Sequence, residues 1–161
     1  MAEIIKQGTC GHKLTWTLDN EGLLTISGEG KMENYGFFDS PFKNTNVTKV
    51  EISQGVTSIG ESAFSGCKAL TSIEIPNSVT SIGLGAFLGC EALTSIEIPN
   101  SVTSIGSYAF EGCEALTNIN ISDGNANYAS VNGVLYDKEK KTLIRCPQTK
   151  TSIEIPNSVT S

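Results

Sequence analysis

The sequence predicts a solenoid, a coil of stacked layers built mostly from parallel β-strands with short helical turns. Two observations carry this prediction. The thirteen residues TSIEIPNSVTSIG occur at 71–83 and again, unchanged, at 94–106. Aligned on this motif, residues 50–72, 73–95 and 96–118 form three repeats of 23 residues. A fixed period of this length is the signature of a repeat architecture, in which each layer is stable only when stacked on its neighbours.

Each repeat is expected to begin with a short strand. Ile73 and Ile75 are two residues apart, so both face the core while Glu74 between them points outward. Pro76 lacks an N–H group and ends the strand. The second half of the repeat, between residues 83 and 89, is expected to make one helical turn that directs its alanine and phenylalanine inward.

The period lies within the range of leucine-rich repeats, about 20–29 residues. The spacing resembles the repeat of the BspA-like leucine-rich-repeat proteins of bacteria, L-x-x-I-x-I-P-x-x-V-x-x-I-G-x-x-A-F-x-x-C. This pattern is complete at 70–90 and 93–113, whereas Ser53 replaces its proline in the first repeat. The resemblance covers about residues 47–161 and implies a leucine-rich-repeat solenoid. Members of this family are typically secreted or surface-anchored proteins of host-associated anaerobes, with repeats implicated in adhesion.

Residues 1–46 differ from the three repeats of 47–118 and are expected to form an N-terminal β-hairpin cap. Apolar and polar residues alternate on both sides of a turn at 19–22. The residues on the apolar face are Trp16, Leu18, Leu24 and Ile26. A cap is needed because the first layer of a solenoid would otherwise expose its core. Four aromatic residues after the hairpin are expected to pack over it: Tyr35, Phe37, Phe38 and Phe42.

Residues 119–152 interrupt the period, because this stretch is longer than one repeat. We interpret it as an irregular repeat with an inserted β-hairpin, in which residues 134–136 pair with residues 142–146. The insertion is either a binding element or only an irregular layer, and the second is favoured. The phase then resumes, and residues 153–161 begin a further, truncated repeat.

The C-terminal end of the coil is expected to stay open. Residues 153–156 would form an edge strand, which offers a homodimer contact. The first residues, MAEIIKQGTCGHKL, lack the apolar core of a signal peptide. Two interpretations follow, an intracellular protein or a piece of a longer one. The interrupted last copy favours the second, and with the family resemblance it suggests an extracellular or cell-surface location.

Composition and charge exclude several classes of partner. The chain has 161 residues, of which 39% are hydrophobic and 17% charged, and its net charge is −6. An acidic chain repels phosphate backbones, so nucleic-acid binding is not expected. The sequence contains no apolar run of about eighteen residues, so membrane insertion is not expected either.

The cysteines and the histidine offer little chemistry. Cys67, Cys90 and Cys113 recur at the repeat period, so we expect a column of buried thiols rather than a metal site. His12 is the only histidine, and with Cys10 it is too little for zinc. Nucleotide-binding and nucleophile motifs do not occur. We therefore expect no catalytic residue, no metal and no cofactor, and we do not expect an enzyme.

The outward strand positions are the candidate binding surface, on the expected concave face. The glutamate column consists of Glu51, Glu74, Glu97, Asn120 and Glu154. The polar column beside it consists of Lys49, Ser72, Ser95, Asn118 and Ser152. Glutamates about 5 Å apart in water repel by about 1 kcal/mol, and a basic partner or a cation would relieve this repulsion. A merely solvated face is the alternative, and it is favoured.

A second candidate contact lies where the near-identical repeats differ. The second and third repeats differ at four of 23 positions, three of them in the expected helical turn. Leu84, Leu88 and Tyr108 would form a small apolar patch on the convex side. Such residues are either a contact site or ordinary exposed side chains, and the ordinary interpretation is favoured.

These observations predict a non-catalytic, protein-binding domain of a bacterial surface or secreted protein. The family resemblance implies adhesion to host or neighbouring-cell proteins, with a host extracellular-matrix or serum protein as the partner. Two alternatives stay open: a structural spacer that displays another module, and an intracellular scaffold.

Overall fold

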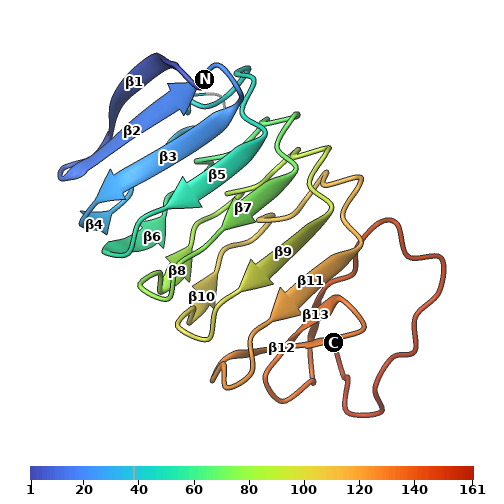
Figure 1. Cartoon of the computed structure of the whole chain (residues 1–161). Helices are drawn as coiled ribbons and strands as arrows, with labels where there is room; N and C mark the ends of the chain where they lie inside the picture. Colours follow the sequence, from blue (N-terminus) through green and yellow to red (C-terminus); the bar gives the residue numbers. More distant parts are fainter. Residues whose placement is uncertain (38) are drawn as a thin grey trace.

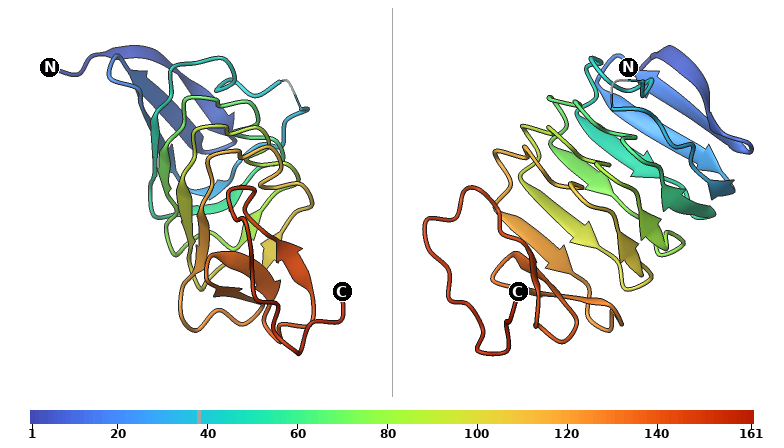
Figure 2. Two further views of the ribbon diagram at one scale, coloured as in Figure 1. Left: turned by 90° about the vertical axis from the view of Figure 1, so that its right-hand side faces the viewer. Right: turned by 180° about the vertical axis from the view of Figure 1, so that it is seen from behind.

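The structure is a computed structural model that describes residues 1–37 and 39–161. Its strands step along one axis, from the hairpin at the N-terminus to a looser segment at the C-terminus (Figure 1). Seen from the side and from behind, each layer of the coil carries strands on two sides and a loop on the rest of its path (Figure 2). The predicted solenoid of mostly parallel strands is confirmed.

The first sheet joins the N-terminal hairpin to the repeats. Its bonded strands are β1 (Ile4–Gly11), β2 (Leu14–Asp19), β3 (Leu23–Gly28), β5 (Lys49–Ile52) and β7 (Ser72–Glu74). Strands β1 to β3 are antiparallel, whereas β3 pairs in parallel with β5. Bonding is interrupted after β7 and resumes between β9 (Ser95–Ile98) and β11 (Asn118–Ile121). The hairpin therefore continues the stack instead of covering it from outside.

A second parallel sheet runs along the other side of each layer. Its strands are β4 (Gly30–Lys31), β6 (Val56–Ile59), β8 (Ser81–Ile82) and β10 (Ser104–Ile105). Equivalent residues of successive repeats lie side by side, as Ile59 does with Ile82 and Ile82 with Ile105. This register follows from the sequence, because repeats of equal length bring the same side chain to the same place in every layer.

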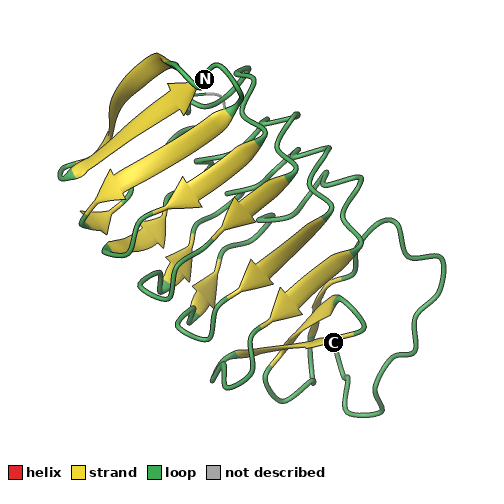
Figure 3. Cartoon of the chain, viewed as in Figure 1, coloured by secondary structure: helices red, strands yellow, loops and turns green. Residues whose placement is uncertain are grey.

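The short helical turns predicted for residues 83–89 are wrong, because the described part of the chain contains strands and turns but no helix (Figure 3). The N–H groups of even-numbered residues 86–90 close tight turns on carbonyl groups three residues earlier. Those of odd-numbered residues 85–89 donate instead to carbonyl groups of residues 107–111 in the next layer. A helix would use all of these amides within its own turn, so stacking and helix formation compete for the same donors.

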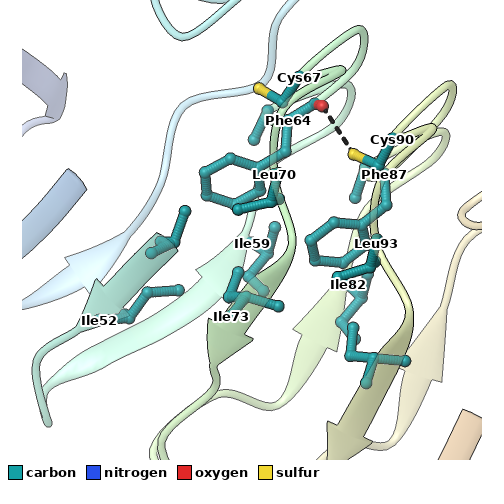
Figure 4. Close-up of a cluster of buried hydrophobic side chains, with 14 of the residues drawn as sticks. Ile52, Ile59, Phe64, Cys67, Leu70, Ile73, Ile82, Phe87, Cys90 and Leu93 are labelled. Carbon is teal, nitrogen blue, oxygen red and sulfur yellow. Dashed lines mark hydrogen bonds between the residues drawn. The ribbon is translucent and has the colours of Figure 1, made fainter. Parts of the chain in front are cut away.

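Aromatic rings form a continuous column through the core. The rings of Phe42, Phe64, Phe87 and Phe110 stack with centroid separations of 5.5, 5.6 and 5.8 Å, and Trp16 meets Phe42 edge-on at 5.3 Å. Buried isoleucines, leucines and cysteines surround this column (Figure 4). Phe42 thus adds a layer from within the expected cap.

The other aromatic residues expected over the hairpin behave differently. Tyr35 is half-buried against the core. Phe37 is 46% exposed, so its expected burial is wrong. Phe38 lies outside the described residues.

Polar side chains of the repeat also hold the layers together. Thr71, Ser78 and Thr80 donate from their hydroxyl groups to backbone carbonyl groups of the layer before, at 3.0, 2.7 and 3.2 Å. Equivalent bonds from Ser101 and Thr103 recur one layer later. The carbonyl groups of Thr48 and Thr57 also accept from the backbone N–H groups of Thr71 and Thr80, so each threonine hydroxyl adds a second hydrogen bond between the layers. The recurrence of serine and threonine in the motif therefore has a structural cause.

The irregular repeat folds as a three-stranded antiparallel sheet over the last layer. Its strands are β12 (Tyr128–Val131), β13 (Val134–Asp137) and β14 (Leu143–Arg145). The N–H group of Ile119 in β11 donates to the carbonyl of Gly133, and that of Ile105 in β10 donates to the Tyr128 hydroxyl. These bonds take the place of a next parallel layer. The expectation that this end of the coil stays open is therefore wrong.

Residues 153–156 form no strand in the described structure, so the expected edge strand is wrong and the homodimer contact that depended on it has no support. The C-terminal segment nevertheless makes hydrogen bonds of the kind found in the regular repeats. The Ser158 hydroxyl donates to the carbonyl of Lys140 at 2.8 Å, and the Thr160 N–H group donates to that of Lys141 at 2.6 Å. The equivalent serine and threonine of earlier layers make the same bonds.

Candidate functional site

The outward side chains of β5, β7, β9 and β11 form one polar surface, which we call the strand face. In the glutamate column, Glu51 lies beside Glu74, and Glu97 lies beside Asn120. In the polar column, the neighbouring pairs are Lys49 with Ser72 and Ser95 with Asn118. All eight side chains are exposed or half-exposed. The register of β5 with β7 aligns four of these residues, and that of β9 with β11 aligns the other four.

The last members of both columns lie elsewhere. Glu154 and Ser152 lie in a segment without strands, and in the described structure β11 pairs with β9 alone. Neither residue is therefore in register with β11. The irregular repeat causes this difference, because it occupies the place of the next parallel layer.

Lys49 links the two columns. Its Nζ lies 3.0 Å from Oε1 of Glu51 and 3.2 Å from Oε1 of Glu74. The hydrogen bond to Glu51, followed by that to Glu74, raises the pKa of Lys49 above its ordinary value. The lysine therefore relieves the repulsion that the sequence predicts between these two glutamates. Sequence reasoning missed this contact because it treated the two columns separately. Such exposed ion pairs contribute little to stability.

On β9 and β11, a side-chain amide joins the two strands of the strand face. Nδ2 of Asn120 donates to Oε1 of Glu97 at 3.0 Å. The face thus combines a charged cluster around Lys49 with a neutral hydrogen-bonded pair one layer on. Its carboxylates outnumber its one cation, so the face is acidic.

The expected convex patch is only partly exposed. Leu84 and Leu88 are half-buried, whereas Tyr108 is 65% exposed. Tyr108 has φ of +59°, and the equivalent Gly85 has φ of +58°. The left-handed conformation thus belongs to this position of the layer, where glycine is unstrained and tyrosine is not.

A hollow of about 440 Å³ lies beside Tyr108. Its walls are the turn at 105–111 and, from the irregular repeat, Leu135, Ile144 and Arg145. Nη1 of Arg145 lies 2.6 Å from Oε2 of Glu111 and so joins the two walls. Sequence analysis could not find this hollow, because the interrupted period does not say where the insertion lies.

The column of cysteines lies in the core. Cys67, Cys90 and Cys113 each donate a thiol hydrogen bond to the carbonyl of a phenylalanine in the layer before. Burial raises the pKa of Cys67 to about 12 and that of Cys113 to about 11, and it also raises the pKa of Cys90. These thiols are therefore protonated and unreactive in the fold. In the described chain, no three histidine, cysteine or acidic side chains are grouped as metal ligands.

A family model described as "BspA type Leucine rich repeat region" matches residues 37–161 in six copies. The chain belongs to this BspA-type leucine-rich-repeat family. The match begins before residue 47, where the sequence predicts the first repeat. This earlier start agrees with Phe42, whose ring already stands in the phenylalanine column of the BspA-type layers.

Solved structures share the fold of this BspA-type chain. A leucine-rich repeat protein from Eubacterium ventriosum is 29% identical over 96% of the chain, with a TM-score of 0.53. A leucine rich cell surface protein from Faecalibacterium prausnitzii is 22% identical over 99%, with a TM-score of 0.60. The pneumococcal vaccine antigen PcpA is 17% identical over 98%, also with a TM-score of 0.60. The last two identities support the fold alone.

The chain spans 55%, 65% and 60% of these three proteins, in that order. A search of curated proteins found no match. Among the described residues, no helix has the length and apolar character needed to cross a bilayer.

Proposed function

We propose that this BspA-type solenoid is the protein-binding part of a bacterial surface or secreted protein, and that it adheres to host or neighbouring-cell proteins. The observation that carries the proposal is the strand face, where Lys49, Glu51 and Glu74 form an exposed charged cluster on hydrogen-bonded parallel strands. Such side chains are held at fixed spacing by the sheet, so little conformational entropy is lost when a partner binds.

The charge of the strand face indicates the kind of partner. Three glutamates of β5, β7 and β9 face outward with one lysine. Complementary charge raises the rate of association and excludes partners of the wrong sign. We therefore propose that the partner protein presents a basic surface. The cell-surface description of the Faecalibacterium prausnitzii protein supports an extracellular location for this chain as well.

Surface plasmon resonance with immobilised extracellular-matrix and serum proteins tests the proposal. We expect at least one of these proteins to bind, and the double substitution Glu74→Lys with Glu97→Lys to weaken that binding about tenfold or more. The matched control is Glu61→Lys with Glu114→Lys, which changes the net charge equally at exposed positions off the strand face. Absence of binding across the panel, or equal losses in both variants, contradicts the proposal.

A structural spacer is the second candidate function. The contacts that recur between successive repeats favour it. The phenylalanine stack and the threonine bonds recur unchanged from layer to layer, which makes a rod. A spacer has no ligand, so its strand-face variants would leave cell attachment unchanged. Deletion of residues 73–95 would shorten the rod by one layer, which small-angle scattering measures, and would leave it folded.

A further inference from the structure

The sheet of the strand face is interrupted between β7 and β9, and we call this junction the seam. Strand β7 is hydrogen-bonded to β5 on its other side, and β9 to β11, but within the described chain β7 and β9 are not bonded to each other. They are nevertheless neighbours in the stack (Figure 1). Ile75, directly after β7, is half-buried, whereas the equivalent Ile52 and Ile98 of the adjoining layers are buried.

The same two layers are joined on their other sides. On the second sheet, Ser81 lies beside Ser104 in the parallel register of β8 and β10. In the turn that follows, the N–H group of Phe87 donates to the carbonyl of Ala109 at 2.9 Å, and the rings of Phe87 and Phe110 stack. The seam is therefore an opening along the strand face and not a missing contact between two layers.

Threonine bonds that form at the junctions on either side are missing at the seam. The N–H group and the hydroxyl of Thr71 both donate to the carbonyl of Thr48. Those of Thr117 both donate to the carbonyl of Thr94. In the part of the chain that the structure describes, Thr94 makes neither bond to the carbonyl of Thr71. The amide of Thr94 therefore reports directly on whether the seam is open or closed.

Strand propensity does not explain the seam, because the two strands lie in identical segments. The sequence LTSIEIP occupies residues 70–76 and again residues 93–99, and each copy pairs with its neighbour on the other side. Pro99 removes one N–H donor from the seam. Pro76 removes the equivalent donor between β5 and β7, and these strands are bonded nonetheless. The cause therefore lies in which two strands meet, not in either strand alone.

Charge distinguishes the seam from the two bonded junctions. Between β5 and β7, Nζ of Lys49 bridges the two neighbouring glutamates at 3.0 and 3.2 Å. Between β9 and β11, the amide of Asn120 donates to the carboxylate of Glu97. At the seam, Glu74 and Glu97 are successive members of the glutamate column, and the uncharged Ser72 stands in the place of the lysine. Like charges on neighbouring strands oppose pairing.

We propose that repulsion between Glu74 and Glu97 holds the seam open, and that a positive charge placed between them closes it, as Lys49 does one layer earlier. Each of the two carboxylates has a partner within its own pair of strands, but no cation or amide of the described chain joins them to each other. Closure would turn the separately bonded strands into one continuous sheet across the strand face. This conformational change belongs to the free chain and goes beyond the proposed binding function.

Hydrogen exchange of the ¹⁵N-labelled chain, followed by NMR, tests this proposal. Thr71 is the internal reference for Thr94, because both threonines lie between a leucine and a serine and so have the same intrinsic exchange rate. We expect the amide of Thr94 to exchange about tenfold faster or more than that of Thr71, since only the second is hydrogen-bonded to the layer before. Equal exchange rates in the unaltered chain overturn the proposal.

A lysine at position 72 supplies the missing cation. Ser72→Lys reproduces at the seam the arrangement that Lys49 makes between β5 and β7, so we expect it to slow exchange of the Thr94 amide by about two- to fivefold. Ser107→Lys is the matched control, because it adds the same charge at an exposed position outside the strand face. No slowing in Ser72→Lys, or equal slowing in both variants, overturns the proposal.

Removal of one negative charge should act in the same direction. Glu97→Gln keeps an oxygen that accepts from Asn120 and abolishes the repulsion, so the Thr94 amide should again exchange about two- to fivefold more slowly. Glu114→Gln, exposed and outside the strand face, should leave the rate unchanged, and an equal effect of both changes contradicts the proposal. These experiments use the chain without a partner, so their failure leaves the proposed binding function intact, and failure of the binding panel leaves the seam intact.

Discussion

The thiol of Cys90 donates a hydrogen bond to the carbonyl oxygen of Phe64 in the layer before, with a sulfur–oxygen distance of 3.2 Å (Figure 4). Cys113 and Phe87 repeat this relationship one layer later, at 3.1 Å. The cysteine is therefore both a small apolar core residue and a hydrogen-bond donor between layers. This double role accounts for its recurrence in the repeat.

We predict that four of the five thiols are protected in the native protein. Cys10, Cys67, Cys90 and Cys113 are buried, whereas Cys146 is half-exposed. A chromogenic disulfide reagent should react rapidly with about one thiol per chain, and with all five in guanidinium. Cys146→Ser should remove the fast phase. A fast phase that survives this substitution would contradict the buried column.

Stability should fall at alkaline pH. The pKa of Cys67 rises from 9.0 to about 12 and that of Cys113 to about 11 on folding, because burial disfavours the thiolate. The unfolded chain therefore releases these protons first, so the stabilisation is complete below pH 9.0 and is lost as pH rises toward 11–12. Urea unfolding under reducing conditions between pH 8 and 11 measures the loss. Cys67→Ala should show a shallower decline.

The phenylalanine column should dominate the stability of the stack. Phe87 is fully buried and stacks on Phe64 and Phe110, so Phe87→Ala should lower the free energy of unfolding by about 3–5 kcal/mol. Phe37→Ala is the matched change at a half-exposed ring and should cost less than about 1 kcal/mol. Equal losses in urea unfolding would show that the column is not the centre of the core.

Tyr108→Gly should stabilise the chain. Its left-handed backbone favours glycine by about 1 kcal/mol, which raises the melting temperature by about 2–4 °C. Tyr108→Ala removes the same ring but keeps the strained conformation, so it should give no such gain. Calorimetry on the two variants separates the backbone effect from loss of the ring. A lower melting temperature in Tyr108→Gly would show that the exposed ring stabilises the fold.

The sequence allowed prediction of the elements that depend on the period. The spacing of Ile73 and Ile75 predicts the strand, and equal repeat lengths predict a stack in which Glu51 lies beside Glu74. The helical turn could not be excluded from residues 83–89 alone, because whether their N–H groups bond within the turn or to the next layer depends on a neighbour. Amide donors shared between layers are a property of the stack, not of one repeat.

Features outside the period were harder to predict. The hairpin around Val134 was visible in the alternation of its residues, but its place over the last layer was not. The ion pair of Lys49 with Glu74 joins two columns and two strands, so no pattern within a single strand predicts it. The place of a residue in the fold could be predicted from the sequence only within the repeats, where equal repeat length puts equivalent residues of neighbouring layers side by side.

Ser158 and Thr160 make the same kind of hydrogen bond as their equivalents in earlier repeats, and this recurrence has an evolutionary consequence. The interlayer hydrogen bonds of serine, threonine and the backbone recur from copy to copy, so duplication or loss of a copy preserves these bonds at each junction. A gene for such a protein can therefore change the reach of its product by recombination between copies, without inventing any new contact.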